Sequence, residues 1–261
     1  MPGYAETANR NLAGHRALVT GAGGNIGSGI ARALAGAGAD VVIHYRLSRE
    51  PAQTLRDELR GAGVDVLSVQ ADLEDAGAVA RLFAAIEDSG PAVDLIVNNA
   101  AAQPVQALSD MQADDWREVL SANLDAAFAV IQFAVRRLRD LRKQGAVVNI
   151  ASIEGSDPAV GHAHYAASKA ALLMLTRACA LEYGPRGIRV NAVSPGLIDR
   201  PGLESDWPDG VARWRAKAPL TRLGTAADVA GAVLFLLGPA ASWISGANLV
   251  VDGGMSAVSR W

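Results

Sequence analysis

Tyr165 and Lys169 are the pair of side chains with the clearest chemical potential in this sequence. They are four positions apart in an alanine-rich segment, so on a helix the phenol and the ammonium lie on one face. A free tyrosine has a pKa of about 10 and is a poor acid or base at neutral pH. A lysine one turn away favours the phenolate and brings the group closer to working pH, unless the two are only neighbours on an ordinary helix.

Ser152 lies thirteen positions before Tyr165 and directly follows the apolar run 146–150 and Ala151. Its hydroxyl can donate a hydrogen bond to a carbonyl oxygen that gains negative charge. Glu154, two positions further on, is the candidate for a contact with a substrate hydroxyl group. We interpret His162 and His164 as loop or supporting residues. No spacing of His, Cys and Asp predicts a metal site.

A second chemical signal is the glycine-rich segment 20–29, TGAGGNIGSG. A phosphate needs backbone N–H donors at the start of a helix and no Cβ in the way. Gly21 is suited to the tight turn and Gly27 to close packing of helix on strand. The residues between them, including Gly24, Asn25 and Ile26, can approach a pyrophosphate. Any tight strand-to-helix turn also uses glycine, so the segment indicates phosphate binding only because it follows a first strand and opens a helix.

The elements that must position these residues are short apolar strands that alternate with alanine-rich helices. The predicted strands are 17–20, 41–45, 66–70, 95–99, 146–150, 188–193 and 247–251. Their apolar runs are continuous, as expected for parallel strands covered on both faces. The pattern predicts an α/β fold: a single Rossmann-like doubly wound domain over 1–261, with a seven-stranded parallel sheet flanked by helices. We expect capping boxes at Thr225 with Asp228 and at Ser109 with Gln112.

Composition excludes several classes of protein. The 261 residues include 24 basic and 27 acidic side chains, without the basic excess of a nucleic-acid binder. The single cysteine, Cys179, excludes an intramolecular disulfide framework, and the N-terminal segment lacks the apolar region of a signal peptide. The uncharged stretch 229–251 is broken at Gly238-Pro239 and is predicted to be a buried helix and strand rather than a membrane span. We expect a cytoplasmic protein.

Four features of the sequence resemble the motifs of the classical short-chain dehydrogenase/reductase family, over about 12–254. They are the glycine segment, Asn98-Asn99-Ala100, Ser152 and Tyr165-x-x-x-Lys169. Within it the chain resembles 3-oxoacyl-carrier-protein reductases and related ketoreductases. The resemblance implies hydride transfer between a nicotinamide cofactor and a carbonyl or secondary alcohol, with Tyr165 as the proton donor. It also implies that Asn123 is the fourth catalytic residue and positions a water that connects Lys169 to solvent.

The same resemblance assigns further cofactor contacts. Asp72 is expected to bind the adenine amino group with Leu73 beside it, and Tyr165 and Lys169 to contact the cofactor as well. The remaining positions matching family contacts are Asn99, Ala100, Pro195, Gly196 and Ile198. The chain departs from the pattern at Asn25 and Ala101, which replace glycines. We expect Asn25 to keep the loop shape because Asn tolerates a left-handed backbone.

The cofactor is predicted to be NADP(H), with NAD(H) as the alternative. An acidic residue at the end of the second strand would bind the ribose of NAD, but Tyr45 stands there and Arg46 follows. Arg46 can pair with a 2′-phosphate, unless it is a solvated loop charge. Arg200, where the family usually has Thr, can contact the pyrophosphate, bind an anionic substrate or face solvent.

The segment 197–222 is expected to cover the substrate, with Trp207 and Trp214 as lid residues or as plain packing. Helix 163–183 is apolar nearly all round, so it is either a deeply packed central helix or part of a subunit interface, and we expect a homotetramer or a dimer. The sequence predicts an NADP-dependent ketoreductase-like enzyme acting on a small molecule. Alternatives are a sugar or polyol dehydrogenase, favoured by the polar loop 154–164, and a non-catalytic cofactor-sensing regulator, which would be expected to lose catalytic residues.

Overall fold

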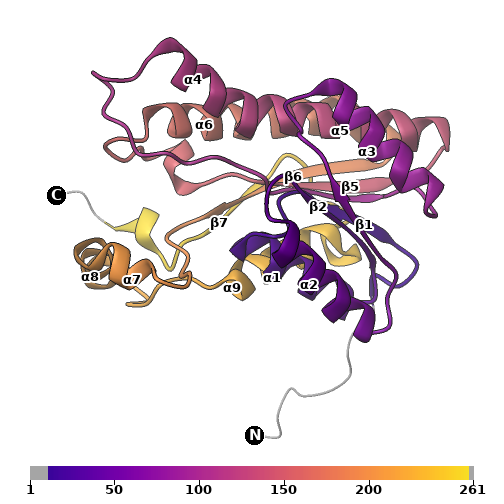
Figure 1. The fold of residues 1–261 in the computed structure, drawn as a ribbon, viewed down its shortest axis with the longest axis horizontal. Coiled ribbons are helices and arrows are strands. Elements are labelled where there is room, and N and C mark those ends of the chain that lie inside the picture. Colours follow the sequence, from indigo (N-terminus) through magenta and orange to yellow (C-terminus); the bar gives the residue numbers. More distant parts are fainter. Residues whose placement is uncertain (1–10, 259–261) are drawn as a thin grey trace, which may run out of the picture.

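Seven parallel strands form one sheet in the computed structural model, which describes residues 11–258 (Figure 1). Their order across the sheet is β3-β2-β1-β4-β5-β6-β7. The strands are β1 Arg16–Val19, β2 Asp40–Tyr45, β3 Val66–Gln70, β4 Leu95–Asn98, β5 Gly145–Ile150, β6 Ile188–Pro195 and β7 Asn248–Val251. Every predicted strand is present with shifts of one or two residues at its ends, so the predicted α/β fold is confirmed.

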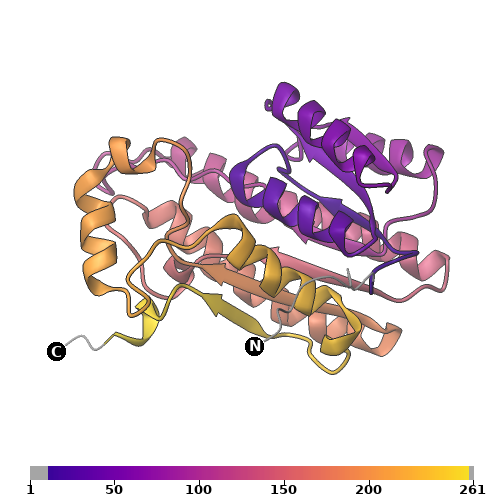
Figure 2. The ribbon, with the colours of Figure 1, turned by 90° about the horizontal axis from the view of Figure 1, so that it is seen from below.

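Helices cover both faces of the sheet (Figures 1 and 2). They are α1 Asn25–Gly36, α2 Arg49–Gly61, α3 Ala76–Asp88, α4 Ala113–Leu120, α5 Ala126–Asp140, α6 Ala163–Tyr183, α7 Leu203–Asp206, α8 Pro208–Lys217 and α9 Ala226–Leu237. Helices α1, α2 and α9 pack on one face, and α3, α5 and α6 on the other. Val41 and Ile43 of β2 point into the first core and Val42 into the second. The continuous apolar strands are therefore covered on both sides.

Parallel strands bring their carboxyl ends to one edge of the sheet. At this edge β1 runs into the glycine turn, β4 into Asn99 and Ala100, and β5 into Ser152. The 3₁₀ turn Ile153–Gly155 then follows Ser152; the other 3₁₀ turns are Gly184–Arg186, Pro239–Ala241 and Met255–Ala257. Both chemical signals of the sequence thus lie at the same edge.

Capping explains where two helices begin. Thr225 and Asp228 form the predicted capping box at the start of α9. The box predicted at Ser109 and Gln112 is wrong. Helix α4 begins at Ala113, and the Gln112 N–H donates to the carboxylate of Asp115 at 2.9 Å, so the capping carboxylate lies one turn further along the chain.

Helices α4 and α5 join through a π-helical turn, Ser121–Asp125, which carries Asn123. In the described part of the chain, the run Ala113–Asp140 is the one helix long and apolar enough to cross a membrane on length and composition alone, with 44% of its apolar window buried. Core helices of globular proteins pass the same test, and α5 packs Val130, Ile131 and Ala134 into the second core. The stretch 229–251 is divided between α9 and β7, as predicted.

The stretch 197–222 folds into the short helices α7 and α8, which stand at one end of the sheet (Figure 2). Trp214 packs with Leu203, Val211 and Leu223 in a small separate core, so it is a packing residue of this segment. Trp207 is half-exposed, and the Arg213 guanidinium lies 5.7 Å from the centroid of its ring.

Candidate active site

A cleft of about 620 Å³ opens at the carboxyl edge of the sheet, where the glycine turn lies. The predicted cofactor residues that line it are Gly21, Gly24, Asn25, Ile26, Gly27, Tyr45, Arg46, Asp72, Leu73, Asn99, Ala100 and Ile198. Pro195, Gly196, Tyr165 and Lys169 are not among its lining residues. A Cβ built on Gly196 would lie 2.7 Å from the Trp214 ring, so this glycine serves the packing of α8.

The glycine turn is held by contacts that leave no space for side chains. Gly21 has a φ of +63°, and a Cβ on it would lie 2.9 Å from Ala100 Cα. A Cβ on Gly27 would lie 2.5 Å from the Gly21 carbonyl oxygen. By contrast, a Cβ on Gly24 meets only that oxygen, at 3.4 Å, so a side chain there would project into the cleft. The turn therefore offers bare backbone to a ligand.

Asn25 does not play the conformational role that we expected. It is the first residue of α1, and Gly24 is the N-cap. The positive φ of the turn falls on Gly21, and the described non-glycine residues with positive φ are Arg142 and Thr221. The Asn25 Nδ2 donates to the Asp199 carbonyl at 2.7 Å, so this side chain ties the glycine turn to the segment after β6.

His44 was missed by the sequence analysis although it lines the cleft. It is buried at the end of β2, where its Nδ1 accepts from the Gly21 N–H at 3.2 Å and its Nε2 donates to the Ala71 carbonyl at 3.0 Å. Burial lowers the pKa of His44, which fits a neutral ring with one acceptor nitrogen. A histidine inside the apolar run VVIHY was the signal that could have identified it.

The end of β2 also holds a charge pair that the sequence did not reveal. The Arg46 Nη1 lies 2.7 Å from Glu74 Oε1, and both residues line the cleft beside Ser48 and Asp72. Glu74 therefore competes with any phosphate for the Arg46 guanidinium. Arg200 also lines the cleft and pairs with Asp206 at 2.8 Å.

Tyr165 and Lys169 lie on the first turns of α6, next to Ser152. The Lys169 Nζ is 5.5 Å from the centroid of the Tyr165 ring and donates to the Ile150 carbonyl at 2.8 Å. Burial lowers the pKa of Lys169 to about 8. Burial raises the pKa of Tyr165 to about 12; hydrogen bonding with Ser152 acts against this rise, and the charge of Glu154 adds to it. In the free protein, desolvation thus outweighs the lowering of the tyrosine pKa that we expected from Lys169.

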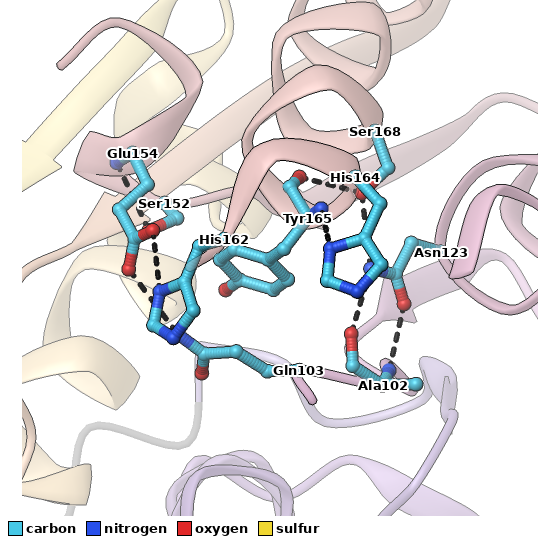
Figure 3. A network of polar contacts seen from close by, with 9 residues as sticks. All are labelled: Ala102, Gln103, Asn123, Ser152, Glu154, His162, His164, Tyr165 and Ser168. Atoms are coloured by element: carbon cyan, nitrogen blue, oxygen red, sulfur yellow. Dashed lines mark hydrogen bonds and ion pairs between the residues drawn. The ribbon is translucent and has the colours of Figure 1, made fainter. Parts of the chain in front are cut away.

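Asn123 lies on the other side of Tyr165 from Glu154 and His162 (Figure 3). Its Oδ1 accepts from the Ala102 N–H at 2.7 Å, and its Nδ2 donates to the Ala102 carbonyl at 2.9 Å and to the Ser168 hydroxyl at 3.0 Å. The side chain therefore joins the segment after β4 to α6. The structure places Ser152 and Lys169 beside the Tyr165 phenol, and it links Asn123 to the same helix through Ser168.

Glu154, His162 and Gln103 form a polar group on the side of Tyr165 that faces Ser152 (Figure 3). Glu154 Oε2 lies 2.8 Å from His162 Nδ1, and Gln103 Nε2 donates to Glu154 Oε1 at 3.2 Å. Gln103 also lines the cleft, as do Ala101 and Ala102. Through Gln103, this group connects the cleft with the side of Tyr165 that faces Ser152. Trp207, the other substrate candidate, is not among the lining residues of the cleft.

Comparison with known proteins identifies the family. Residues 21–256 match the model of a family described as enoyl-(acyl carrier protein) reductase. The chain is 37% identical to L-rhamnose 1-dehydrogenase (NAD(P)(+)) of Azotobacter vinelandii, over 91% of this chain and 95% of that protein. It is 36% identical to the 3-oxoacyl-[acyl-carrier-protein] reductase FabG of Staphylococcus aureus, over 92% and 97% of the two chains. The chain belongs to the short-chain dehydrogenase/reductase family.

The fold agrees with this membership. The solved structure of a short-chain alcohol dehydrogenase from Sinorhizobium meliloti superimposes with a TM-score of 0.91 at 34% identity, covering 96% of this chain and 100% of that one. As a short-chain dehydrogenase/reductase, the protein is an oxidoreductase that acts on alcohol or carbonyl groups and uses a nicotinamide cofactor.

Proposed function

We propose that this short-chain dehydrogenase/reductase is a ketoreductase-like enzyme that uses NADP(H) and acts on a small carbonyl compound or secondary alcohol. The observation that carries the proposal is the grouping of Ser152, Tyr165 and Lys169 beside the glycine-lined cleft. The presence of all four catalytic positions argues against a non-catalytic regulator on the same fold.

The described residues fit a dinucleotide. Gly24 leaves open space where a side chain would project into the cleft, and the N–H groups at the start of α1 point a helix N-terminus at a phosphate. Asp72 and Leu73 would hold the adenine, Asn99 and Ala100 the ribose, and Ile198 the nicotinamide end. When bound, the nicotinamide supplies or takes up a hydride.

The protein residues handle the proton and the developing charge. Tyr165 donates its phenolic proton to the carbonyl oxygen during reduction and takes it back during oxidation. Ser152 donates a hydrogen bond to the same oxygen and orients it. Lys169 places a positive charge near the phenol, which favours the phenolate after proton transfer. Asn123 keeps the segment after β4 fixed against α6 so that these groups stay in place.

Preference for NADP(H) is supported by two features of β2. Tyr45 supplies no carboxylate to repel a 2′-phosphate, and Arg46 lies at the rim of the cleft. Arg46 engages the phosphate in competition with Glu74, which holds its Nη1, and we expect this competition to reduce the preference for NADP(H). Arg200 also lines the cleft, where it would bind the pyrophosphate or an anionic substrate in competition with Asp206.

The test is a spectrophotometric panel of substrates with NADPH and NADH. Acetoacetyl and crotonyl thioesters of N-acetylcysteamine, simple ketones and sugars cover the ketoreductase, enoyl reductase and sugar dehydrogenase reactions. We expect oxidation of NADPH with a ketone and none with the crotonyl thioester. Reduction of the crotonyl double bond alone, or no turnover of any carbonyl despite NADPH binding, would contradict the proposal.

We also propose a homotetramer, or at least a dimer, in the cytoplasm. Large apolar side chains are exposed on α5, α6 and β7: Phe128, Met174, Leu181, Leu249 and Val250. Such a surface favours burial against a second copy. The α7–α8 segment is proposed to cover the substrate. Light scattering at micromolar concentration should give a multiple of 27.0 kDa, and the monomer mass would contradict the assembly.

A further inference from the structure

Three side chains from different parts of the chain meet beside the catalytic phenol. Gln103 comes from the segment after β4, Glu154 from the turn after β5, and His162 from the residue before α6. The Glu154 N–H donates to Ser152 Oγ at 3.1 Å, which fixes this residue to the catalytic serine. The His162 and Tyr165 rings lie edge to face with centroids 6.1 Å apart. The group is therefore part of the substrate side of the site.

The group keeps hydrogen-bonding capacity. The contacts among the described residues use His162 Nδ1 and one Gln103 N–H, and they leave His162 Nε2 and Gln103 Oε1 outside any hydrogen bond found there. The Glu154 and His162 side chains are 15% and 17% exposed, so they are partly desolvated but still accessible. A carboxylate has about four acceptor sites, and two contacts do not fill them.

A carboxylate in this position favours substrates that carry hydrogen-bond donors. Hydroxyl groups next to the reacting carbon can donate hydrogen bonds to the Glu154 carboxylate and to Gln103 Oε1. They can also form a hydrogen bond with His162 Nε2. An acyl thioester offers only methylene groups and carbonyl acceptors near its reacting carbon, so it would desolvate Glu154 without replacing its hydrogen bonds.

We propose that Glu154, His162 and Gln103 form a binding site for substrate hydroxyl groups, and that the substrate is a polyhydroxylated compound, a sugar or a polyol. This inference rests on the proposed function and narrows it: the carbonyl or alcohol carbon that reacts at Tyr165 carries a neighbouring hydroxyl group held by Glu154. The group of Glu154, His162 and Gln103 thus favours a sugar or polyol substrate over a carrier-bound acyl chain.

The test compares dihydroxyacetone with acetone as substrates for NADPH-dependent reduction. We expect the wild type to favour dihydroxyacetone in kcat/KM by about 10- to 100-fold, as for a hydrogen bond to a charged group. Glu154→Gln should reduce this ratio about tenfold, and Gln103→Leu by a smaller factor. Glu58→Gln is the matched control, because that exposed carboxylate pairs with Arg32 away from the site, and it should keep the ratio.

A wild-type ratio near one, an unchanged ratio in Glu154→Gln, or an acetoacetyl thioester turned over better than dihydroxyacetone would overturn the inference. Failure of the proposed function is a different outcome, namely no turnover of any probe. Saturation-transfer NMR of glycerol against isopropanol, with NADP⁺ bound, then decides independently of turnover. Preferential binding of glycerol that is lost in Glu154→Gln supports the hydroxyl site, and equal binding of the two alcohols contradicts it.

Discussion

The proposed cofactor cleft and the proposed substrate side of Tyr165 present different chemical groups. The cleft is lined at Gly21, Gly24 and Gly27 by bare backbone, whereas the substrate side carries the ionisable side chains of Glu154 and His162. Backbone groups are positioned by the fold itself, so a change of residue there disturbs the chain path. Side chains can be exchanged without moving the chain. The comparison therefore predicts that substitutions of the cleft glycines alter cofactor binding or stability, while substitutions of Tyr165 and Glu154 alter turnover or substrate preference and leave the cofactor cleft intact.

The largest effect is expected for Tyr165→Phe. The variant removes the proposed proton donor and leaves the ring in its buried site. We expect kcat to fall by about 10³-fold or more, because the hydroxyl group that gives its proton to the carbonyl oxygen is lost. Fluorescence titration should show NADPH binding close to that of the wild type. Near-normal turnover would show that Tyr165 is not the acid, and lost NADPH binding would show that the two regions are not separable.

Cofactor preference should depend on Arg46 and its partner Glu74. We expect the wild type to bind NADPH more tightly than NADH by about 10- to 150-fold, as for a charge-assisted contact. Arg46→Ala should remove most of this preference by weakening NADPH, and Tyr45→Asp should move it towards NADH. Glu74→Gln releases the Arg46 guanidinium and should increase the preference. Equal binding of the two cofactors by the wild type, or an unchanged ratio in Arg46→Ala, would show that another group reads the phosphate.

Substitutions at two glycines of the same turn should separate the effect on NADPH binding from the effect on stability. Gly27→Ala places a Cβ against the Gly21 carbonyl and should lower the free energy of unfolding by about 1–3 kcal/mol. Gly24→Ala makes only an ordinary contact, at 3.4 Å, with the Gly21 carbonyl oxygen. Its melting temperature should therefore stay near that of the wild type while the Kd for NADPH rises about tenfold or more. Gly36→Ala, at the end of α1 with free space around it, is the matched control for both measurements. Loss of binding without loss of stability in Gly27→Ala would reverse these assignments.

The smallest effect concerns pH and His44. Because burial lowers the pKa of His44 in the folded protein, the unfolded chain takes up a proton at a higher pH than the folded one. Stability from this group is therefore present above about pH 6.5 and is lost as the pH falls through the folded pKa. The nearby charge of Asp72 opposes the shift but does not cancel it. The melting temperature of His44→Asn should fall less than that of the wild type between about pH 7 and pH 5. Parallel curves would exclude His44 as a source of the pH dependence.

The sequence predicted what depends on local pattern. Continuous apolar runs placed all seven strands, and the apolar character of 163–183 placed α6 within its observed bounds, Ala163–Tyr183. What escaped prediction is a set of contacts between distant positions of the chain. Arg46 and Glu74 are brought together by two loops, and His44 reaches Gly21 across neighbouring strands. Asn25, which follows β1, reaches Asp199, which follows β6 three strands away. Asn25 was misinterpreted because a residue that follows an N-cap is already helical, whatever its tolerance for a positive φ.

The π-helical turn Ser121–Asp125 limits the residue deletions that the chain can tolerate. An α-helix advances by about 100° per residue, and a π-turn accommodates one residue more than a regular turn. Deleting one residue there would restore a regular helix and rotate α4 relative to α5 by about that angle. Asn123 would then leave Ala102 and Ser168, or Val130 and Ile131 would leave the core. We therefore expect a single-residue deletion in this segment to disrupt either the contacts of Asn123 or the core, whereas a substitution of the exposed Asp125 should be tolerated.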